Sequence, residues 1–363
     1  MQFRLVPLVL LLLFSIYGCQ SSFGPHALQR THPAYNQAIV TSVNEQMLQN
    51  LVRIRYRDVP FFLEIGSVTA SLSLGGNAGV NAGVEFGGSD SLSPSLGISY
   101  SDNPTISYTP LQGENLLKSI LSPLQLESIL VLTQSGWSIS RVFGLCFERI
   151  NSIYNAPTAS GPTPEREPDY RAYTRLLELL RVLQENRLIE IGTRQEGETQ
   201  HILIQLNNGQ EAFRQEVEEV YELLNLDRNR DSFVLSTDFL QVKDSQWTVR
   251  PRSMSSLLYY LSQNIDIPPE HQQAGLVTAT ASNNGGSFDW SVTPAGSLFQ
   301  VRSSTEAPTN AFIATRYRGN WFYISDTDLR SKSTFILLRQ LFDLQAGQTK
   351  YDGPTLTLPV GGR

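Results

Sequence analysis

The chain has 363 residues and a formal net charge of -6, and 40% of its residues are hydrophobic. This apolar content is enough for more than one folded core, so a wholly disordered chain is not expected. The acidic balance and the lack of any Lys- or Arg-rich run also argue against the electrostatic footprint of a nucleic-acid-binding protein.

Residues 1–18 have the layout of a secretory signal. Arg4 precedes an apolar stretch over residues 5–16, and Gly18 stands directly before Cys19. The apolar stretch is shorter than a membrane-spanning helix requires. We therefore expect this segment to direct export and to be removed, and we expect residues 19–37, which show no periodicity, to form a flexible tether.

The cysteine at the expected cleavage point predicts an anchor. Ile16-Tyr17-Gly18-Cys19 resembles the lipobox of bacterial lipoproteins, which implies that Cys19 is acylated. Several acyl chains on one residue hold a protein at a membrane stably, whereas one chain is marginal. Residue Gln20 is not Asp, which by similarity to the sorting rule of enteric bacteria implies a periplasm-facing protein anchored in the outer membrane. The alternative is an ordinary signal in which Cys19 has no such role.

Acylation of Cys19 would leave Cys146 as the one remaining cysteine, so an intrachain disulfide is not expected. Cys146 shares a predicted apolar helix face with Val142, Phe143 and Ile150. A buried and unreactive thiol is therefore expected, and not a nucleophile.

The most informative stretch of the sequence lies between residues 65 and 111. Even positions from Ala70 to Phe86 are apolar or Gly, whereas the odd positions are Ser, Thr, Gly, Asn or Glu. The alternation resumes after a turn-like segment at residues 87–91, and Asp102 and Pro104 interrupt it. This period of two predicts a Gly-rich β-hairpin with one apolar face. The residues expected on that face, as membrane or oligomer contacts, are Ala70, Leu72, Leu74, Ala78, Val80, Ala82, Val84 and Phe86.

Two interpretations of this hairpin stay open. An apolar and a polar face are typical of strands that line a membrane pore, and the pattern is similar to the hairpins of oligomeric export channels such as secretins and the curli secretion channel. One hairpin cannot span a bilayer alone, so a pore needs a ring of subunits. A sheet that packs within the chain or between subunits gives the same alternation. The small side chains on the apolar face favour this second interpretation, with residues 66–110 joining subunits.

The expected fold class is α+β, built from several modules. Helices are predicted over residues 39–54 and 113–153, followed by a Pro-rich linker at 154–168. A helix at 169–187 and strands at 188–192 and 201–206 resemble a winged-helix module, without a basic surface for DNA. The expected modules are residues 38–153 with the hairpin and helices, residues 169–250 with a helix and β-wing, and residues 251–363 with a C-terminal α+β part.

The C-terminal part is expected to be rich in strands. Ser253 is the predicted cap of a helix over residues 254–265, after an acidic helix at 210–224. Arg318-Gly319-Asn320 predicts a hairpin turn between two strands. The remaining expected elements are strands at 276–281, 288–293, 298–303, 311–317, 321–325 and 355–360, and a helix at 329–344.

A search for catalytic chemistry finds one candidate cluster. The sequence has four histidines with no zinc-like spacing, and neither a Walker loop nor a GxSxG elbow, so no metal, cofactor or catalytic residue is assigned. Asp326 and Asp328, with Arg330 and Lys332, could hold a divalent ion and a phosphorylated ligand. The simpler interpretation is that an aspartate caps the following helix, and we favour it because a metal needs more than two carboxylates.

Three segments resemble a family of proteobacterial outer-membrane lipoproteins with no assigned activity. They are residues 44–58, residues 108–114 and residues 326–332. The resemblance implies a location at the outer membrane and does not imply an enzymatic activity. The expected function is a non-catalytic structural or assembly component of a cell-envelope complex, held by N-terminal acyl chains and associated with further copies or another envelope protein. The alternatives are a pore subunit and an envelope polymer-processing enzyme.

Overall fold

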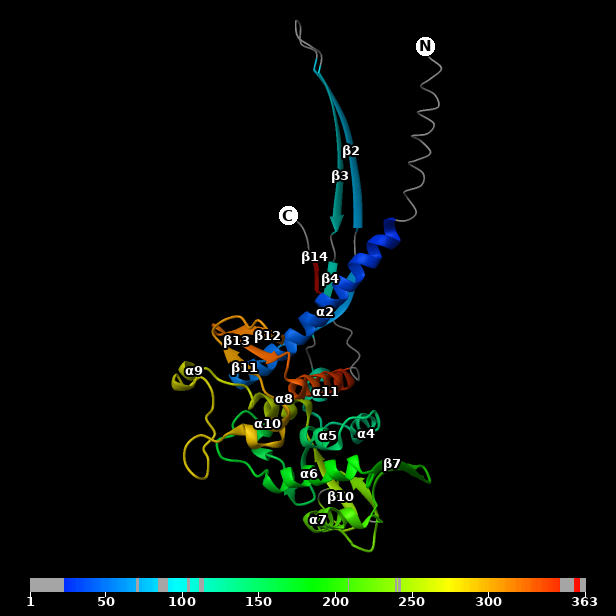
Figure 1. Ribbon diagram of the computed structural model, residues 1–363, viewed down its shortest axis with the longest axis vertical. Helices are drawn as coiled ribbons and strands as arrows, with labels where there is room; N and C mark the ends of the chain where they lie inside the picture. The colour runs from blue at the N-terminus through cyan, green and yellow to red at the C-terminus, as the bar shows by residue number, and fades with distance from the viewer. Residues whose placement is uncertain are drawn as a thin grey trace. The chain divides into compact units, whose positions relative to one another are not determined.

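The computed structural model describes residues 23–69, 72–83, 91–102, 105–110, 114–207, 209–238, 240, 243–346 and 356–359 (Figure 1). The expected signal, the lipidation residue Cys19, and Ala70, Val84 and Phe86 of the hairpin lie outside these residues. Helices make up 46% and strands 22%, so the fold is α+β, as the sequence predicts. The chain divides into two compact units, which are described separately.

The first unit contains residues up to 43, residues 63–111 and residues from 352. In this unit β2 (Leu72–Gly83) and β3 (Ser91–Asp102) form an antiparallel hairpin, which confirms the predicted one. The register runs without a shift from Leu72 opposite Asp102 to Gly83 opposite Ser91. Even-numbered residues therefore pair with even-numbered residues, as at Ala78 and Leu96, so the alternation of the two strands is in phase.

A second sheet of this unit has the order β1-β4-β14. Its strands are β1 (Leu63–Thr69), β4 (Thr105–Pro110) and β14 (Leu356–Pro359). The register between β1 and β4 shifts between Ile65 and Ser67 and ends with Thr69 opposite Thr105. Gly66 is the extra residue at this bulge, a position that glycine tolerates well.

Helix α2 (Phe23–Arg55) is longer than the helix expected from the sequence. It begins inside the segment for which an irregular tether was expected, and Pro33 lies within it. Proline removes one helical hydrogen bond at such a position, whereas Pro25 falls in the first turn, where no intrahelical donor is needed. The part of α2 from Asn44 to Arg55 belongs to the second unit.

The second unit is built around a six-stranded sheet with the order β6-β5-β10-β9-β8-β7. All neighbours are antiparallel except β9 and β10, which are parallel. The strands are β5 (Phe147–Ile150), β6 (Ile153–Tyr154), β7 (Ile189–Glu196), β8 (Thr199–Leu206), β9 (Ser232–Ser236) and β10 (Gln246–Pro251). Between them lie η1 (Pro157–Ser160), α6 (Arg171–Glu185), η2 (Glu211–Phe213) and α7 (Arg214–Leu224), so the predicted helix and two-stranded wing are present.

Three helices precede this sheet and one of them differs from the prediction. They are α3 (Glu114–Leu121), α4 (Leu126–Gln134) and α5 (Ile139–Cys146). The sequence predicts that the last helix continues to Ile150, but strand β5 starts at Phe147. The Arg252 amide donates to the carbonyl oxygen of Cys146 at 2.7 Å, and Val249 lies opposite Ile150 in the sheet. Residues 147–150 therefore form hydrogen bonds with β10 and do not continue the helix.

The C-terminal part of the unit contains fewer strands than the sequence predicts. Its elements are α8 (Met254–Ser262), α9 (Pro269–Gln273), η3 (Trp290–Val292), α10 (Pro294–Leu298), β11 (Arg302–Ser304), β12 (Ala311–Tyr317), β13 (Asn320–Ser325) and α11 (Leu329–Ala346). The strand expected at 276–281 is an irregular segment, and the one expected at 288–293 is largely replaced by η3. The strand expected at 298–303 is present only as β11, which starts at Arg302. The Thr293 hydroxyl accepts a hydrogen bond from the Gly296 amide, and Pro294 is the first residue of α10. Both residues favour the start of a helix, so a strand does not form here despite the apolar alternation.

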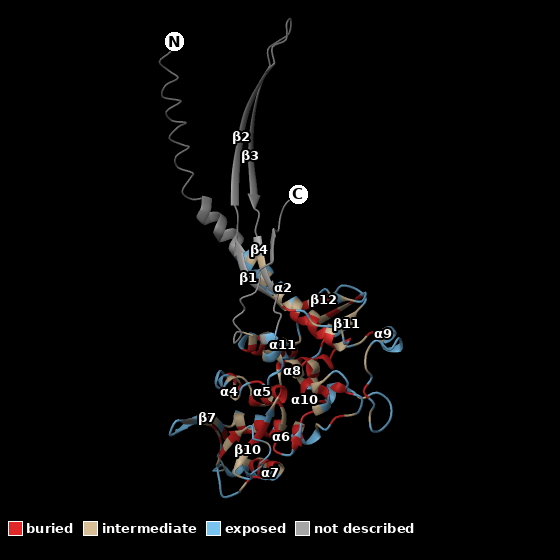
Figure 2. Cartoon of the chain, turned by 180° about the vertical axis from the view of Figure 1, so that it is seen from behind, coloured by how far each residue is buried: buried red, intermediate tan, exposed pale blue. Residues whose placement is uncertain are grey.

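Other predictions for this part are confirmed. The Ser253 hydroxyl accepts from the Ser256 amide at 3.1 Å and caps α8. Arg318 and Gly319 have φ values of 47° and 89° between β12 and β13, which is the left-handed geometry of a tight hairpin turn. Buried residues of the second unit gather along α5, α6, α8 and α11 (Figure 2). Among the described residues, no helix is long and apolar enough to span a membrane.

Candidate functional site

The structure places the two aspartates of the candidate cluster at the start of α11. Asp328 precedes the first helical residue, and its Oδ1 accepts a hydrogen bond from the Ser331 amide at 3.1 Å. Its Oδ2 accepts from the Ser331 hydroxyl at 2.7 Å. Both carboxylate oxygens therefore serve the helix N-terminus, which is the capping interpretation of the sequence.

The other members of this cluster do not converge on a shared ligand position. Lys332 Nζ donates to Asp326 Oδ1 at 2.6 Å and lies 5.0 Å from the centre of the Phe312 ring. Arg330 lines a separate cavity, described below. Within the described ranges there is no group of three or more His, Cys, Asp or Glu side chains that could hold a metal ion.

Cys146 lies in the core of the second unit. It is fully buried at the end of α5, and burial raises the pKa of its thiol to about 12. A thiol that stays protonated at neutral pH is a poor nucleophile. The structure thus agrees with a packing role for this cysteine.

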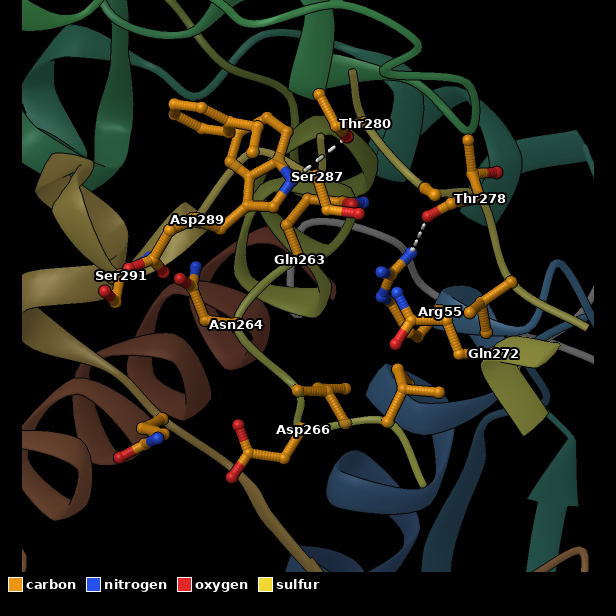
Figure 3. A pocket seen from close by; sticks show the side chains of 18 of the residues that line it. Arg55, Gln263, Asn264, Asp266, Gln272, Thr278, Thr280, Ser287, Asp289 and Ser291 are labelled. Carbon is orange, nitrogen blue, oxygen red and sulfur yellow. Dashed lines mark hydrogen bonds between the residues drawn. The ribbon is translucent and has the colours of Figure 1, made fainter. Parts of the chain in front are cut away.

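The sequence does not indicate a polar cavity of about 420 Å³ in the second unit (Figure 3). Its lining comes from the residues that follow α8, the irregular segment 277–280, the segment around η3, and Arg55 from α2. These pieces are far apart in the sequence, and most of them belong to segments for which strands were expected. The fold therefore brings the lining together without leaving a local motif.

Two buried amide side chains contribute polar groups to the lining of this cavity. Gln263 and Asn264 are 6% and 8% exposed, and neither Gln263 Oε1 nor Asn264 Oδ1 has a hydrogen-bond partner among the residues that the structure describes. Their amide nitrogens donate to the carbonyl oxygens of Tyr259 at 3.2 Å and Tyr260 at 3.4 Å. The side chains thus satisfy the last carbonyl groups of α8, and this leaves their oxygens as acceptors at the cavity.

Arg55 is the cation of the cavity. Its Nη1 donates to the carbonyl oxygen of Thr278 at 3.2 Å, while its buried Nε has no partner within the described part of the chain. Burial lowers the pKa of Arg55 to about 10. The guanidinium points toward the cavity from one side of residues 263–266, and Asn264 and Asp266 lie on the other side (Figure 3).

The carboxylates of the cavity are Asp266 and Asp289. Desolvation raises the pKa of Asp266, and a hydrogen bond from Gln300 opposes this shift. Asp289 Oδ1 accepts from the Ser291 amide at 2.9 Å and caps η3. Gly296 also lines the cavity, and a Cβ there would meet the Trp290 carbonyl oxygen, so the close approach of η3 and α10 requires glycine.

The cavity is equipped for binding more clearly than for catalysis. Its described lining residues include no His, Cys or Lys, and the hydroxyl of Thr280 donates to the carbonyl oxygen of Pro164 at 2.6 Å. No described lining hydroxyl is paired with a base that could activate it as a nucleophile. The free amide oxygens and the Arg55 Nε would instead hold a small polar ligand or ordered water by hydrogen bonds.

No protein-family model, curated protein or solved structure matches this chain. The features of the site described above therefore stand on their own geometry.

Proposed function

We propose that this protein is an outer-membrane-anchored lipoprotein that acts as a non-catalytic assembly component of a cell-envelope complex. In this proposal, acylated Cys19 holds the chain at the membrane, and residues 66–110 join it to further copies of itself. Two features of the sequence support this location at the outer membrane: the signal-like residues 1–18, and the resemblance of Ile16-Tyr17-Gly18-Cys19 to a lipobox.

The observation that carries the proposal is the two-stranded sheet of β2 and β3. Each strand has twelve residues, and within the described residues neither strand has a second neighbour. An isolated hairpin is marginal in water, and each of its two edges offers unpaired amides and carbonyls to another strand. The matching hairpin of a second copy would satisfy such an edge and would extend the in-phase apolar face.

A pore subunit is the second candidate because of the strand length. About ten tilted residues cross the apolar core of an outer membrane, and β2 and β3 each have twelve. The pore predicts that single cysteines at Ala78 and Val80, in a Cys146→Ser background, react with lipid-soluble but not with aqueous maleimides. Cysteines at Asn77 and Asn81 should show the reverse. Aqueous labelling at Ala78 and Val80 would exclude the pore and leave a periplasmic sheet.

The enzyme alternative has less support. It was centred on Asp326 and Asp328, and these side chains are engaged by Lys332 and by the first turn of α11. A pair of carboxylates that works by acid-base chemistry needs free oxygens at a substrate. We therefore favour the assembly role.

The proposed location at the outer membrane is tested by fractionating cells that produce the protein. Cys19→Ser should leave the protein soluble in the periplasm or unprocessed, because the acyl anchor is lost. Cys146→Ser is the matched control, since it removes the other cysteine and should stay with the outer membrane. A Cys19→Ser protein that still fractionates with outer membranes would contradict the lipid anchor.

A further inference from the structure

A second cavity of the second unit has a different chemistry from the one in Figure 3. It has a volume of about 540 Å³ and lies among α5, α6, α10 and the start of α11. Its charged lining residues are Arg141, Arg181, Arg330 and Glu178. In a chain with a net charge of -6, this is a local excess of positive charge.

The charges of this cavity are only partly neutralised by the protein. Glu178 pairs with Arg175 at 3.2 Å, and Arg181 pairs with Glu185 at 3.2 Å. Within the described part of the chain, Arg141 and Arg330 form no ion pair with a carboxylate. The carboxylate that lines the cavity, Glu178, is paired with Arg175, so an anion in the cavity would stabilise the guanidinium groups of Arg141 and Arg330.

The two arginines are held close to each other by the fold. Arg141 Nη1 donates to the carbonyl oxygen of Arg330 at 3.0 Å and also bonds to the Thr334 hydroxyl. Burial and the neighbouring charge of Arg330 lower the pKa of Arg141. The two like charges repel each other, and the fold nevertheless holds them close together.

Neutral donors at the same cavity come from the first turn of α5. Ser138 and Ser140 line it together with Arg141, and their hydroxyl oxygens are 2.7 Å apart. Ser138 is the N-cap residue of α5, yet its side chain makes no capping bond. The Ile139 amide at this end of α5 is already bonded to Gln184 Oε1 at 2.8 Å, and the helix dipole adds partial positive charge here.

We propose that the cavity among α5, α6, α10 and α11 binds a phosphate group, with Arg141 and Arg330 as its main ligands. A phosphate monoester carries up to two negative charges and offers several oxygens, which matches two fork-shaped guanidinium groups and nearby hydroxyls. The source can be free phosphate or the headgroup of a lipid. This proposal is independent of the assembly role proposed above.

The test measures heat on titration of the purified full-length protein with inorganic phosphate, against sodium chloride at the same ionic strength. A second titration uses a short-chain phosphatidic acid below its micelle concentration, with the corresponding phosphatidylcholine as reference. Saturable binding of phosphate supports a free anion, whereas binding of the phosphatidic acid alone supports a lipid headgroup. Binding of neither probe would overturn the proposal.

Variants assign the binding to this cavity. Arg330→Gln should weaken binding by about tenfold or more, because an exposed charged donor of the cavity is lost. Arg141→Gln should act similarly, and Arg141→Lys should retain part of the affinity. The matched control is Arg194→Gln, an exposed arginine on β7 outside the cavity. Equal affinity of Arg330→Gln and wild type would contradict the assignment even if Arg141→Gln failed to fold.

Discussion

The guanidinium of Arg252 lies with its carbon atom 4.1 Å from the centre of the Tyr260 ring in the core of the second unit. Arg252 is 1% exposed, and it also donates to the Asn155 carbonyl oxygen and to the Ser160 hydroxyl. Tyr260 in turn donates to Asn155 Oδ1 at 2.8 Å. Asn155 Nδ2 donates to the carbonyl oxygens of Gly144 and Phe147, each at 2.8 Å. This buried polar network therefore joins α5, β5, η1 and α8.

We expect Arg252→Ala to destabilise the second unit by about 3–5 kcal/mol, because the substitution leaves buried polar partners without a donor. Denaturant unfolding followed by tryptophan fluorescence measures this change. Arg194→Ala, at an exposed position, should change the free energy of unfolding by less than about 0.5 kcal/mol. Similar values for both variants would show that the network adds little to stability.

Capping at α11 gives a second prediction. Asp328→Ala should lower stability by about 0.5–2 kcal/mol, and Asp328→Asn or Asp328→Ser should largely restore it, because each keeps an oxygen that accepts from the Ser331 amide. Asp326→Ala should cost about 0–1 kcal/mol, since its pair with Lys332 is half exposed. Thermal unfolding compares the four variants. A loss of function in Asp328→Asn with unchanged stability would point instead to a ligand site.

Asp58 gives a prediction for acid stability. Its Oδ2 accepts hydrogen bonds from the Tyr317 hydroxyl and from Arg318 Nη2, and these bonds lower the pKa of the carboxyl below its ordinary value of 3.8. The stabilisation is present above the ordinary pKa and is lost as the pH falls through the lowered folded-state pKa. Below about pH 4, the stability of Asp58→Asn should fall less steeply with acidification than that of wild type. The free energy of unfolding is measured in urea at each pH. Equal slopes of this free energy against pH for wild type and Asp58→Asn would contradict the assignment.

The partly buried Gln184 and the buried Gln263 can be compared directly. Gln184 Oε1 accepts from the Ile139 amide at 2.8 Å, whereas Gln263 Oε1 has no partner among the described residues. Gln184→Met should therefore cost about 0.5–1.5 kcal/mol. Gln263→Met should cost less, because it breaks the hydrogen bond of the amide nitrogen to the Tyr259 carbonyl oxygen but none of the amide oxygen. Thermal unfolding of the unliganded protein checks the difference. An equal or larger cost at Gln263 would indicate that its oxygen is satisfied, by ordered water for example.

Much of the fold could be predicted because its elements carry local signals. The alternation from residue 70 to 86 predicts the hairpin, the Ser253 cap predicts the start of α8, and Arg318-Gly319 predicts a turn with positive φ. These features depend on a few neighbouring residues. The structure agrees with them where it describes the chain.

The predictions that the structure contradicts failed for two physical reasons. The apolar alternation at residues 288–293 resembles that of a strand, but Asp289 caps a helical turn there, and Thr293 and Pro294 start α10 directly after it. Helix α5 ends at Cys146 because residues 147–150 pair with β10, about a hundred residues further along the chain. Neither cavity could be predicted, because Arg55 and Gln263, or Arg141 and Arg330, come together only through tertiary packing.

The central claim is that the β2–β3 hairpin joins copies of the chain, and the mass of the detergent-extracted protein tests it most directly. Thr69 lies opposite Thr105, so an Asn-Gly turn can replace residues 70–104 while β1 and β4 stay paired. The intact protein should have a mass that is a multiple of the mass of one processed and acylated chain, and the shortened variant should be a monomer with the second unit still folded. A monomeric intact protein, or a shortened variant that forms the same oligomer, would contradict the claim.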